Sequence, residues 1–213
     1  YSFTPTRHER TIVLPGHLSF VVAVSGVAAE KTGAAQEKYN RAALGVREIL
    51  SRWNAHPDLP TSDSLAAALH SSEDAIEKAS ALVAGDRWLE RRLAHFLAES
   101  ERLVPGAGEA LAKGDLDALG TIVDESQEQA AVTLGNQVPE TVFLAEQARA
   151  AGALAASSFG AGFGGSVWAL LPTVDAEDFA EEWLGRYRAQ YAQAASQAST
   201  LVTRPGSPLR PVV

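Results

Sequence analysis

The chain has 213 residues, of which 46% are apolar and 21% are charged, and its formal net charge is -8. This composition is typical of a soluble globular protein, and the length is enough for one full hydrophobic core or at most two small ones. The negative charge argues against a general nucleic-acid surface, which needs clustered positive charge. The chain contains no cysteine, so disulfides and thiolate metal sites are excluded. No run approaches the roughly 18 apolar residues that a membrane span requires.

The first part of the sequence predicts two strands followed by helices. Residues 11–14 and 18–24 are rich in apolar and β-branched side chains, and Pro15 and Gly16 separate them. A helix is expected from near Thr32 to Trp53, because apolar residues recur there at spacings of three and four. A segment with two prolines, residues 56–60, ends this helix. Two shorter helices are expected after it, reaching about residues 69 and 83.

Capping residues and helix breakers divide the middle of the chain. Asp86 predicts the start of a long helix, and Pro105 and Gly106 predict its end. Asp115 is expected to cap a helix that runs to about residue 134. Pro139 suits the first turn of another helix, which is expected to end near residue 152.

The segment between residues 156 and 171 holds four glycines within six positions, flanked by strand-like residues. The run Gly160-Ala-Gly-Phe-Gly-Gly165 formally matches the dinucleotide-binding pattern G-x-G-x-x-G. That pattern requires a helix directly after the turn, whereas the apolar residues from Ser166 to Leu171 predict a buried strand. The sequence therefore predicts a strand–loop–strand hairpin whose backbone N–H groups can face an anion such as a phosphate. A hairpin in which the glycines only let two strands pack is the alternative.

The remaining sequence predicts a helix over residues 175–193 and a last strand over residues 199–203. Four or five strands, several of them separated by helices, indicate the α+β class, with one antiparallel sheet and helices packed on one face. The five histidines share no metal-ligand spacing, and no pair of carboxylates marks an acid–base site. Neither a catalytic residue nor a metal site is therefore predicted.

Several motifs occur in the same order as in the galactokinase branch of the GHMP small-molecule kinases. The run from Ser158 to Ser166, followed by an apolar strand, resembles the third, C-terminal motif of that branch. Residues 20–27 resemble the strand that opens the family's C-terminal half. Weaker agreement is found in the segments 37–41, 91–102, 114–120 and 139–140. Over about residues 1–205, the chain thus resembles the C-terminal half of a galactokinase-like sugar kinase.

The resemblance implies a ferredoxin-like core with a helical insertion, so that residues 1–213 form one GHMP kinase C-terminal domain. It implies a cytoplasmic enzyme that transfers the γ-phosphoryl group of Mg-ATP to the anomeric hydroxyl of a hexose such as galactose. The family's ATP-binding loop and catalytic Asp belong to an N-terminal half that has no counterpart here, and the chain starts at Tyr1 without a Met. We therefore expect the isolated chain to be inactive, and to associate with an N-terminal half or with itself. Sugar and ATP are the expected small-molecule partners, with no nucleic acid and no membrane.

The resemblance also assigns the substrate-binding residues. Tyr39 is expected to border the sugar, although its place on an apolar helix face also fits a tyrosine of the core. The loop is expected to lie near sugar and phosphates through five residues: Gly160, Gly162, Gly164, Gly165 and Ser166.

Two departures from the family pattern bear on the substrate. Ala161 and Ser166 stand where most galactokinases have a glycine and a cysteine, and the run Asn136-Gln-Val-Pro139 stands where the family usually has Val-Ser-Cys-Pro. The accepted sugar can therefore differ from galactose. A second hypothesis is a catalytically inactive sugar- or nucleotide-binding regulatory module that has kept the shape of a GHMP kinase.

Overall fold

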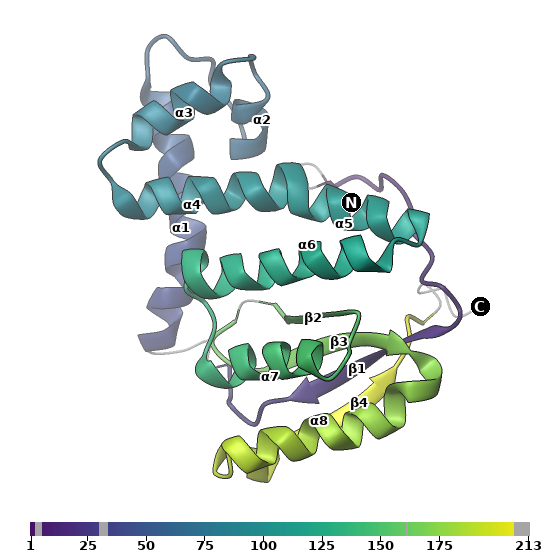
Figure 1. The fold of residues 1–213 in the computed structure, drawn as a ribbon. Coiled ribbons are helices and arrows are strands. Elements are labelled where there is room, and N and C mark those ends of the chain that lie inside the picture. The colour runs from purple at the N-terminus through teal and green to yellow at the C-terminus, as the bar shows by residue number, and fades with distance from the viewer. Residues whose placement is uncertain (3–5, 30–33, 161, 207–213) are drawn as a thin grey trace, which may run out of the picture. The chain divides into compact units, whose positions relative to one another are not determined.

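The structure is a computed structural model that describes residues 1–2, 6–29, 34–160 and 162–206, and for residues 34–39 and 42 it describes the backbone alone. The chain forms two compact units (Figure 1). The sheet unit comprises Ile12–Ala29, Gly106–Gln127 and Gln137–Val213. The helical unit comprises Tyr1–Thr11, Glu30–Pro105 and Glu128–Asn136. Each unit buries apolar side chains of its own.

Four antiparallel strands form the sheet, in the spatial order β2-β3-β1-β4. Their bounds are β1 (Leu18–Val24), β2 (Ala155–Ser158), β3 (Ser166–Pro172) and β4 (Ser199–Thr203). Val21 of β1 lies opposite Ala169 of β3 and Val202 of β4. Because side chains alternate along a strand, these three residues share one face of the sheet. The strands expected over 18–24, 166–171 and 199–203 are confirmed, as is the pairing of β2 with β3 across the glycine segment.

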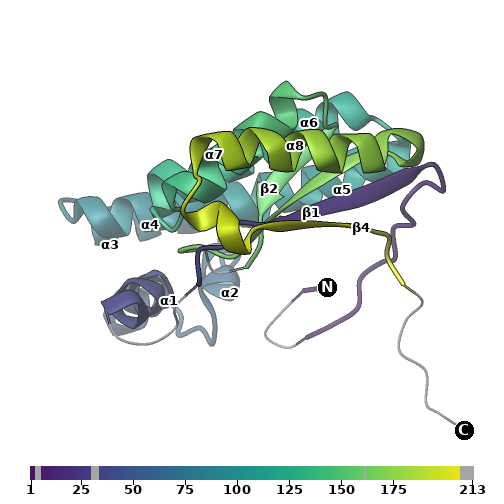
Figure 2. The same ribbon diagram turned by 90° about the horizontal axis from the view of Figure 1, so that it is seen from below.

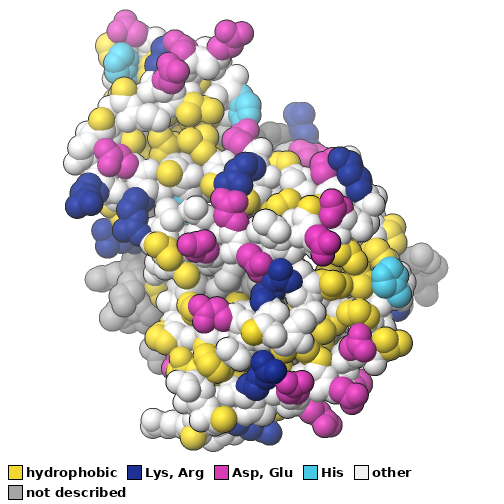
Figure 3. All heavy atoms as spheres, viewed as in Figure 1, with side chains coloured by type: hydrophobic (Ala, Val, Ile, Leu, Met, Phe, Trp, Pro, Cys, Tyr) yellow, Lys and Arg dark blue, Asp and Glu magenta, His cyan; other side chains and the backbone are white. Residues whose placement is uncertain are grey.

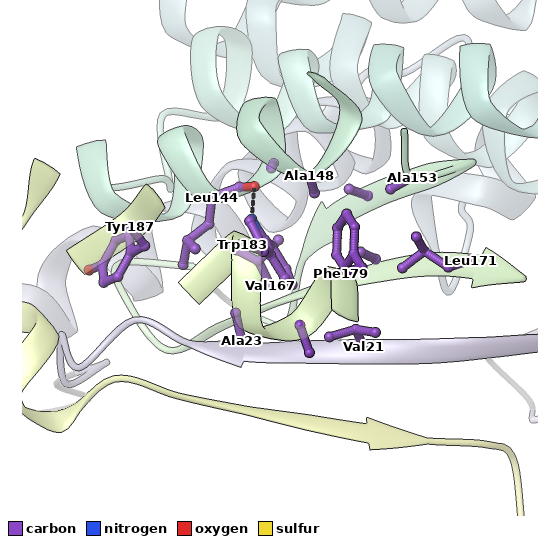
Figure 4. Close-up of a cluster of buried hydrophobic side chains, with 14 of the residues drawn as sticks. Val21, Ala23, Leu144, Ala148, Ala153, Val167, Leu171, Phe179, Trp183 and Tyr187 are labelled. Atoms are coloured by element: carbon purple, nitrogen blue, oxygen red, sulfur yellow. Dashed lines mark hydrogen bonds between the residues drawn. The ribbon is translucent and has the colours of Figure 1, made fainter. Parts of the chain in front are cut away.

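That face carries the larger core of the sheet unit, under α7 (Pro139–Ala150) and α8 (Ala176–Gln190). Figure 2 shows both helices on the same side of the sheet. Trp183 and Tyr187 of α8 are fully buried in this core (Figure 4). The indole Nε1 of Trp183 donates to the carbonyl oxygen of Leu144 at 2.9 Å. The hydroxyl of Tyr187 donates to the backbone carbonyl oxygen of Ser25 at 2.6 Å. The polar atoms of both rings are thus paired, which makes their burial favourable.

On the opposite face, side chains near β2 pack against α5 (Val104–Lys113) and α6 (Leu116–Glu128). This second cluster consists of Leu18, Ala110, Leu119, Val123, Ala155 and Leu170. Beside it, the rings of Phe20 and Trp168 meet edge to face with centroids 5.6 Å apart. Toward β4 the face is more open, since Leu201 is 61% exposed. The expected α+β class and the antiparallel sheet are confirmed. The expectation that the helices pack on one face only is wrong, because α5 and α6 cover part of the other face.

The helical unit is built from α1 (Ala34–Ala55), α2 (Leu65–Leu69), α3 (Ala75–Val83) and α4 (Arg87–Leu97). Trp53 lies fully buried among apolar side chains of all four helices, and its Nε1 donates to the carbonyl oxygen of Pro60 at 2.8 Å. The carboxylate of Asp86 accepts the N–H of Leu89, so the expected cap of the long helix is confirmed. Arg52 also reaches Asp86, at 3.2 Å, and so joins α1 to the start of α4.

Two expectations from the sequence are wrong. Residues 11–14 form no strand, because β-branched residues need a neighbouring strand to pair with, and here Leu14 packs against the second cluster instead. The helix expected to end at Pro105 and Gly106 does not end there. A π-helix, η1 (Ala98–Leu103), follows α4 and leads directly into α5, which places Pro105 in the first turn of α5. The missing N–H of Pro105 falls at the junction of the two helices, where the hydrogen-bond pattern changes from π to α.

Three short elements complete the fold. The π-helix η2 (Gln129–Leu134) extends α6 and ends at Gly135, which has φ 69°. The expected helix to about residue 134 is therefore confirmed, and the carboxylate of Asp115 caps it by accepting the N–H of Ala118 at 3.0 Å. The 3-10 turns η3 (Thr173–Asp175) and η4 (Ala194–Gln197) precede and follow α8.

Candidate functional site

The glycine loop, residues 159–165, joins β2 to β3 and has an unusual backbone. Its φ angles are 62° at Gly160, 79° at Gly162, 61° at Phe163, 124° at Gly164 and 86° at Gly165. Phe163 is the one residue other than glycine with a positive φ in the part of the chain that the structure describes. Such a conformation costs energy for a side chain with a β-carbon, and it persists only where the surroundings impose it. The loop is therefore held in a defined shape.

Backbone hydrogen bonds fasten this loop to the segment that follows β1. The N–H of Ser25 donates to the carbonyl oxygen of Gly165, and the N–H of Gly165 donates to that of Val27, each at 2.9 Å. A β-carbon on Gly164 would lie 2.7 Å from the carbonyl oxygen of Val27, closer than real contacts allow. Glycine is thus required at Gly164 both for its φ angle and for the close approach of two backbones.

The loop leaves backbone donors available. The N–H groups of Phe163 and Gly164 donate to no acceptor among the described residues. Backbone N–H groups of this kind can bind an anion or a ligand hydroxyl. The arrangement can therefore bind a ligand through the backbone, without a charged side chain.

The structure brings most of the expected site residues together. Gly160, Gly162, Gly164 and Gly165 lie in one loop, and Ser166 begins β3 opposite Val24 of β1. Tyr39 belongs to α1 of the helical unit, and its side chain lies outside the described residues, as do Glu30 and Lys31. Its place beside the sugar therefore stays a prediction.

Sequence reasoning missed a set of polar residues that hold β2 from the side of α6. The Arg149 guanidinium binds the carboxylate of Asp124, with Nε 2.8 Å from Oδ1 and Nη2 3.0 Å from Oδ2. Its Nη1 donates to the carbonyl oxygens of Ala153 and, at 2.6 Å, Leu154. Nearer the loop, the side-chain oxygen of Gln127 accepts hydrogen bonds from the hydroxyls of Ser157 and Ser158 and from the backbone N–H of Ser158. No motif reveals these contacts, although Asp124 and Gln127 are three residues apart and so face the same side of α6.

Tyr187, which bonds the segment that holds the loop, has a shifted pKa. Burial raises the pKa of Tyr187 to about 12, and the charge of Glu140 adds to the effect. The phenol therefore stays protonated and keeps its hydrogen bond to Ser25, which immediately precedes the segment that holds the loop. Tyr187 acts as a structural anchor for that segment and not as a base.

His95, in the helical unit, is buried beside the guanidinium of Arg92. It is 8% exposed, and its Nδ1 lies 3.1 Å from Nη1 of Arg92. Burial, together with the charge of Arg92, lowers the pKa of His95. A neutral imidazole that accepts from the guanidinium satisfies both observations.

Among the described residues, no group of three or more His, Asp or Glu side chains could hold a metal ion, and no helix is long and apolar enough to cross a membrane. On the face seen in Figure 3, Lys and Arg side chains are scattered among Asp and Glu and form no continuous basic surface.

Comparison with known proteins agrees with the resemblance carried by the motifs. Residues 108–189 match the family model described as GHMP kinases C terminal. Galactokinases of Mycobacterium tuberculosis (strain ATCC 25618 / H37Rv) and Mycobacterium bovis (strain BCG / Pasteur 1173P2) are each 38% identical over 91 residues, which is 43% of this chain and 25% of theirs. The crystal structure of Lactococcus lactis galactokinase complexed with galactose superposes with a TM-score of 0.74 at 26% identity, over 92% of this chain and 47% of that one.

The chain thus spans about half the length of the structurally similar galactokinase. The matched family segment contains α6, α7, the glycine loop and most of α8. The resemblance predicted from the motifs is therefore confirmed: this chain is similar to the C-terminal part of a galactokinase-like GHMP sugar kinase.

Proposed function

We propose that the chain is the C-terminal part of an ATP-dependent sugar kinase, which transfers the γ-phosphoryl group of ATP to the anomeric hydroxyl of a hexose such as galactose. The observation that supports this most is the glycine loop, whose positive φ angles leave the N–H groups of Phe163 and Gly164 available beside the segment after β1. Similarity to galactokinases supplies the substrate class.

Backbone donors suit this reaction. Phosphoryl transfer needs mainly positioning and stabilisation of charge spread over the phosphoryl oxygens, with little covalent chemistry from the protein. Donors fixed in place before the substrate arrives need no reorganisation during the reaction. In the proposed enzyme, the loop binds hydroxyl or phosphate oxygens through its N–H groups, and Tyr39 borders the sugar.

Mg-ATP fits the loop only in part. The loop can accept the anionic part of the nucleotide, but the described residues offer no cluster of carboxylates for the cation. The similar galactokinase is about twice as long as this chain, and in the proposed enzyme the nucleotide loop, the cation ligands and the catalytic base belong to an N-terminal half. The present chain contributes the loop and the sheet that carries it.

The test is phosphoryl transfer by the longest natural protein that contains this sequence. ADP release is followed with ATP and a panel of hexoses, and the product is identified as a hexose 1-phosphate or another ester. A sugar that lacks the anomeric hydroxyl, 1-deoxygalactose, serves as the control and should give no turnover. Turnover with 1-deoxygalactose would contradict the proposed acceptor. Saturable binding of sugar or nucleotide without any transfer would favour the alternative, an inactive binding module.

A further inference from the structure

The amide of Gln127 accepts three hydrogen bonds at the point where β2 becomes the glycine loop. Gln127 lies near the end of α6, and its Oε1 is 3.0 Å from the Oγ of Ser157, 3.0 Å from the N of Ser158 and 3.2 Å from the Oγ of Ser158. Ser158 is the last residue of β2, and Phe159, which follows it, is the first residue of the loop. One side-chain oxygen therefore accepts from both serine hydroxyls and from the backbone N–H of Ser158.

The backbone donor decides how the amide is oriented. An N–H can only donate, so the group facing Ser158 must be the oxygen and not the NH₂. The other end of the amide, Nε2, is then buried and has no hydrogen-bond partner among the described residues. An unpaired buried donor is destabilising, so a residue chosen only for stability at this position would avoid it.

The same helix also fixes the start of β2. A β-carbon on Gly120 would lie 2.4 Å from the carbonyl oxygen of Leu154, so α6 and the strand approach there as closely as two backbones can. Arg149, held by Asp124 of α6, donates to that same carbonyl oxygen. Contacts from α6 and Arg149 therefore hold β2 at both ends, and those of Gln127 lie at the end next to the loop.

We propose that Gln127 is a positioning residue for the glycine loop, because its carbonyl oxygen fixes the end of β2 from which the loop departs. This inference rests on the proposed kinase function, since the loop is taken to bind the substrates. Misplacing a binding group by about 1 Å can reduce turnover about a hundredfold. Loss of the three hydrogen bonds is therefore expected to lower kcat more than it weakens ground-state binding.

Two variants of similar shape distinguish the effect of losing the acceptor oxygen from the effect of changing the size of the side chain. Gln127→Met keeps the length but removes the oxygen, whereas Gln127→Glu keeps an acceptor oxygen at the same reach. Gln190→Met, at an exposed position at the end of α8, is the matched control. In the longest natural protein that contains this sequence, Gln127→Met should lower kcat on the order of tenfold or more, with KM for sugar and ATP changed by less than about threefold. Gln127→Glu and Gln190→Met should stay within about threefold of the native enzyme.

A second measurement does not depend on kinase activity. Hydrogen–deuterium exchange of the peptide covering residues 158–166 should become on the order of tenfold faster in Gln127→Met and should stay near the native rate in Gln127→Glu. Exchange in β1 and α8 should be unchanged. If the native protein transfers no phosphoryl group, the proposed function fails, while the exchange experiment still decides the role of Gln127.

Three outcomes would overturn the inference. The first is native kinetics and native loop exchange in Gln127→Met. The second is faster exchange throughout the sheet with kinetics of the folded fraction unchanged, which would make Gln127 a stability residue only. The third is equal damage in Gln127→Glu and Gln127→Met. If Gln127→Met does not fold, Ser158→Ala removes one of the three donors and should speed loop exchange severalfold, and no change there would equally contradict the proposal.

Discussion

Replacing Gly164 with alanine tests how the glycine loop is held. A β-carbon at this position has two separate costs. The φ angle of 124° is strained for any side chain, which costs about 1–3 kcal/mol. The β-carbon would also lie 2.7 Å from the carbonyl oxygen of Val27 and 3.1 Å from that of Ala28, so the loop must move away from this segment. That movement breaks the two backbone hydrogen bonds of Gly165, at about 1 kcal/mol each.

The expected total is therefore about 3–5 kcal/mol of local free energy. Most of it should appear as loss of loop structure and not as global unfolding, because the α7 and α8 core does not depend on the loop. Binding of sugar or nucleotide, measured by calorimetry in the longest natural protein, should weaken more than the melting temperature falls. We expect at least a tenfold loss of affinity and a Tm change of only a few degrees.

Two other glycines provide controls for this experiment. Gly160 has φ 62°, and its β-carbon would meet nothing within 4 Å, so Gly160→Ala has the strain without the clash and should cost about 1 kcal/mol. Gly185 lies in α8 with open space around it, and Gly185→Ala should stabilise the protein by about 0.5–1 kcal/mol. If Gly164→Ala lowers Tm steeply while the folded fraction binds ligand normally, the loop is only a structural turn. Equal effects of Gly164→Ala and Gly160→Ala would refute the close-approach argument.

Three further predictions concern Tyr39, the isolated chain and His70. Tyr39→Phe in the natural enzyme should raise KM for the sugar or lower kcat with little effect on KM for ATP, and unchanged kinetics with both substrates would place Tyr39 in the core. The present chain alone should show no sugar-dependent ATP consumption, and addition of a separately expressed N-terminal half should restore it; turnover by the chain alone would contradict the half-enzyme interpretation. His70 has a raised pKa, first because its Nδ1 bonds the carbonyl oxygen of Ala66 and second because Glu101 lies 3.0 Å from its Nε2. The resulting stabilisation is fully present below the unfolded pKa of about 6.5 and is lost as pH rises through the higher folded pKa. Because His70 is 62% exposed, Glu101→Gln should remove only a few tenths of a kcal/mol at pH 5.5 and nothing at pH 8.5 in urea unfolding; an equal loss at both pH values would exclude this linkage.

Local sequence patterns were sufficient for most elements of the fold. The run 18–24, apolar except for Ser19, became β1, and its buried side chains lie on both faces of the sheet. Asp86 capped α4 because its carboxylate reaches the N–H of Leu89 within the same turn. The spacing of Phe179, Trp183 and Tyr187 marked one face of α8, and all three side chains are buried in the core of the sheet unit. Each of these features depends on residues at most eight positions apart.

The same patterns failed where a neighbour distant in sequence decides the outcome. Residues 11–14 have the composition of a strand, but no adjacent strand offers them hydrogen bonds, and the segment stays irregular. Pro105 ends helices in general, but the π-helix before it lets the chain restart a helix with the proline in a permitted place.

For the candidate site, the amino-acid pattern alone predicted the loop: the glycines between two strand-like runs marked residues that adopt positive φ angles. That pattern explains neither why Gly164 must be glycine nor what fixes the end of β2. Those depend on contacts of Gly164 with Val27 and of Gln127 with Ser158, which are 137 and 31 positions apart in the chain. A glycine or a glutamine looks the same in the sequence whether or not a distant backbone approaches it. The roles of Gly164 and Gln127 therefore follow from the folding of the chain, which brings these segments into contact.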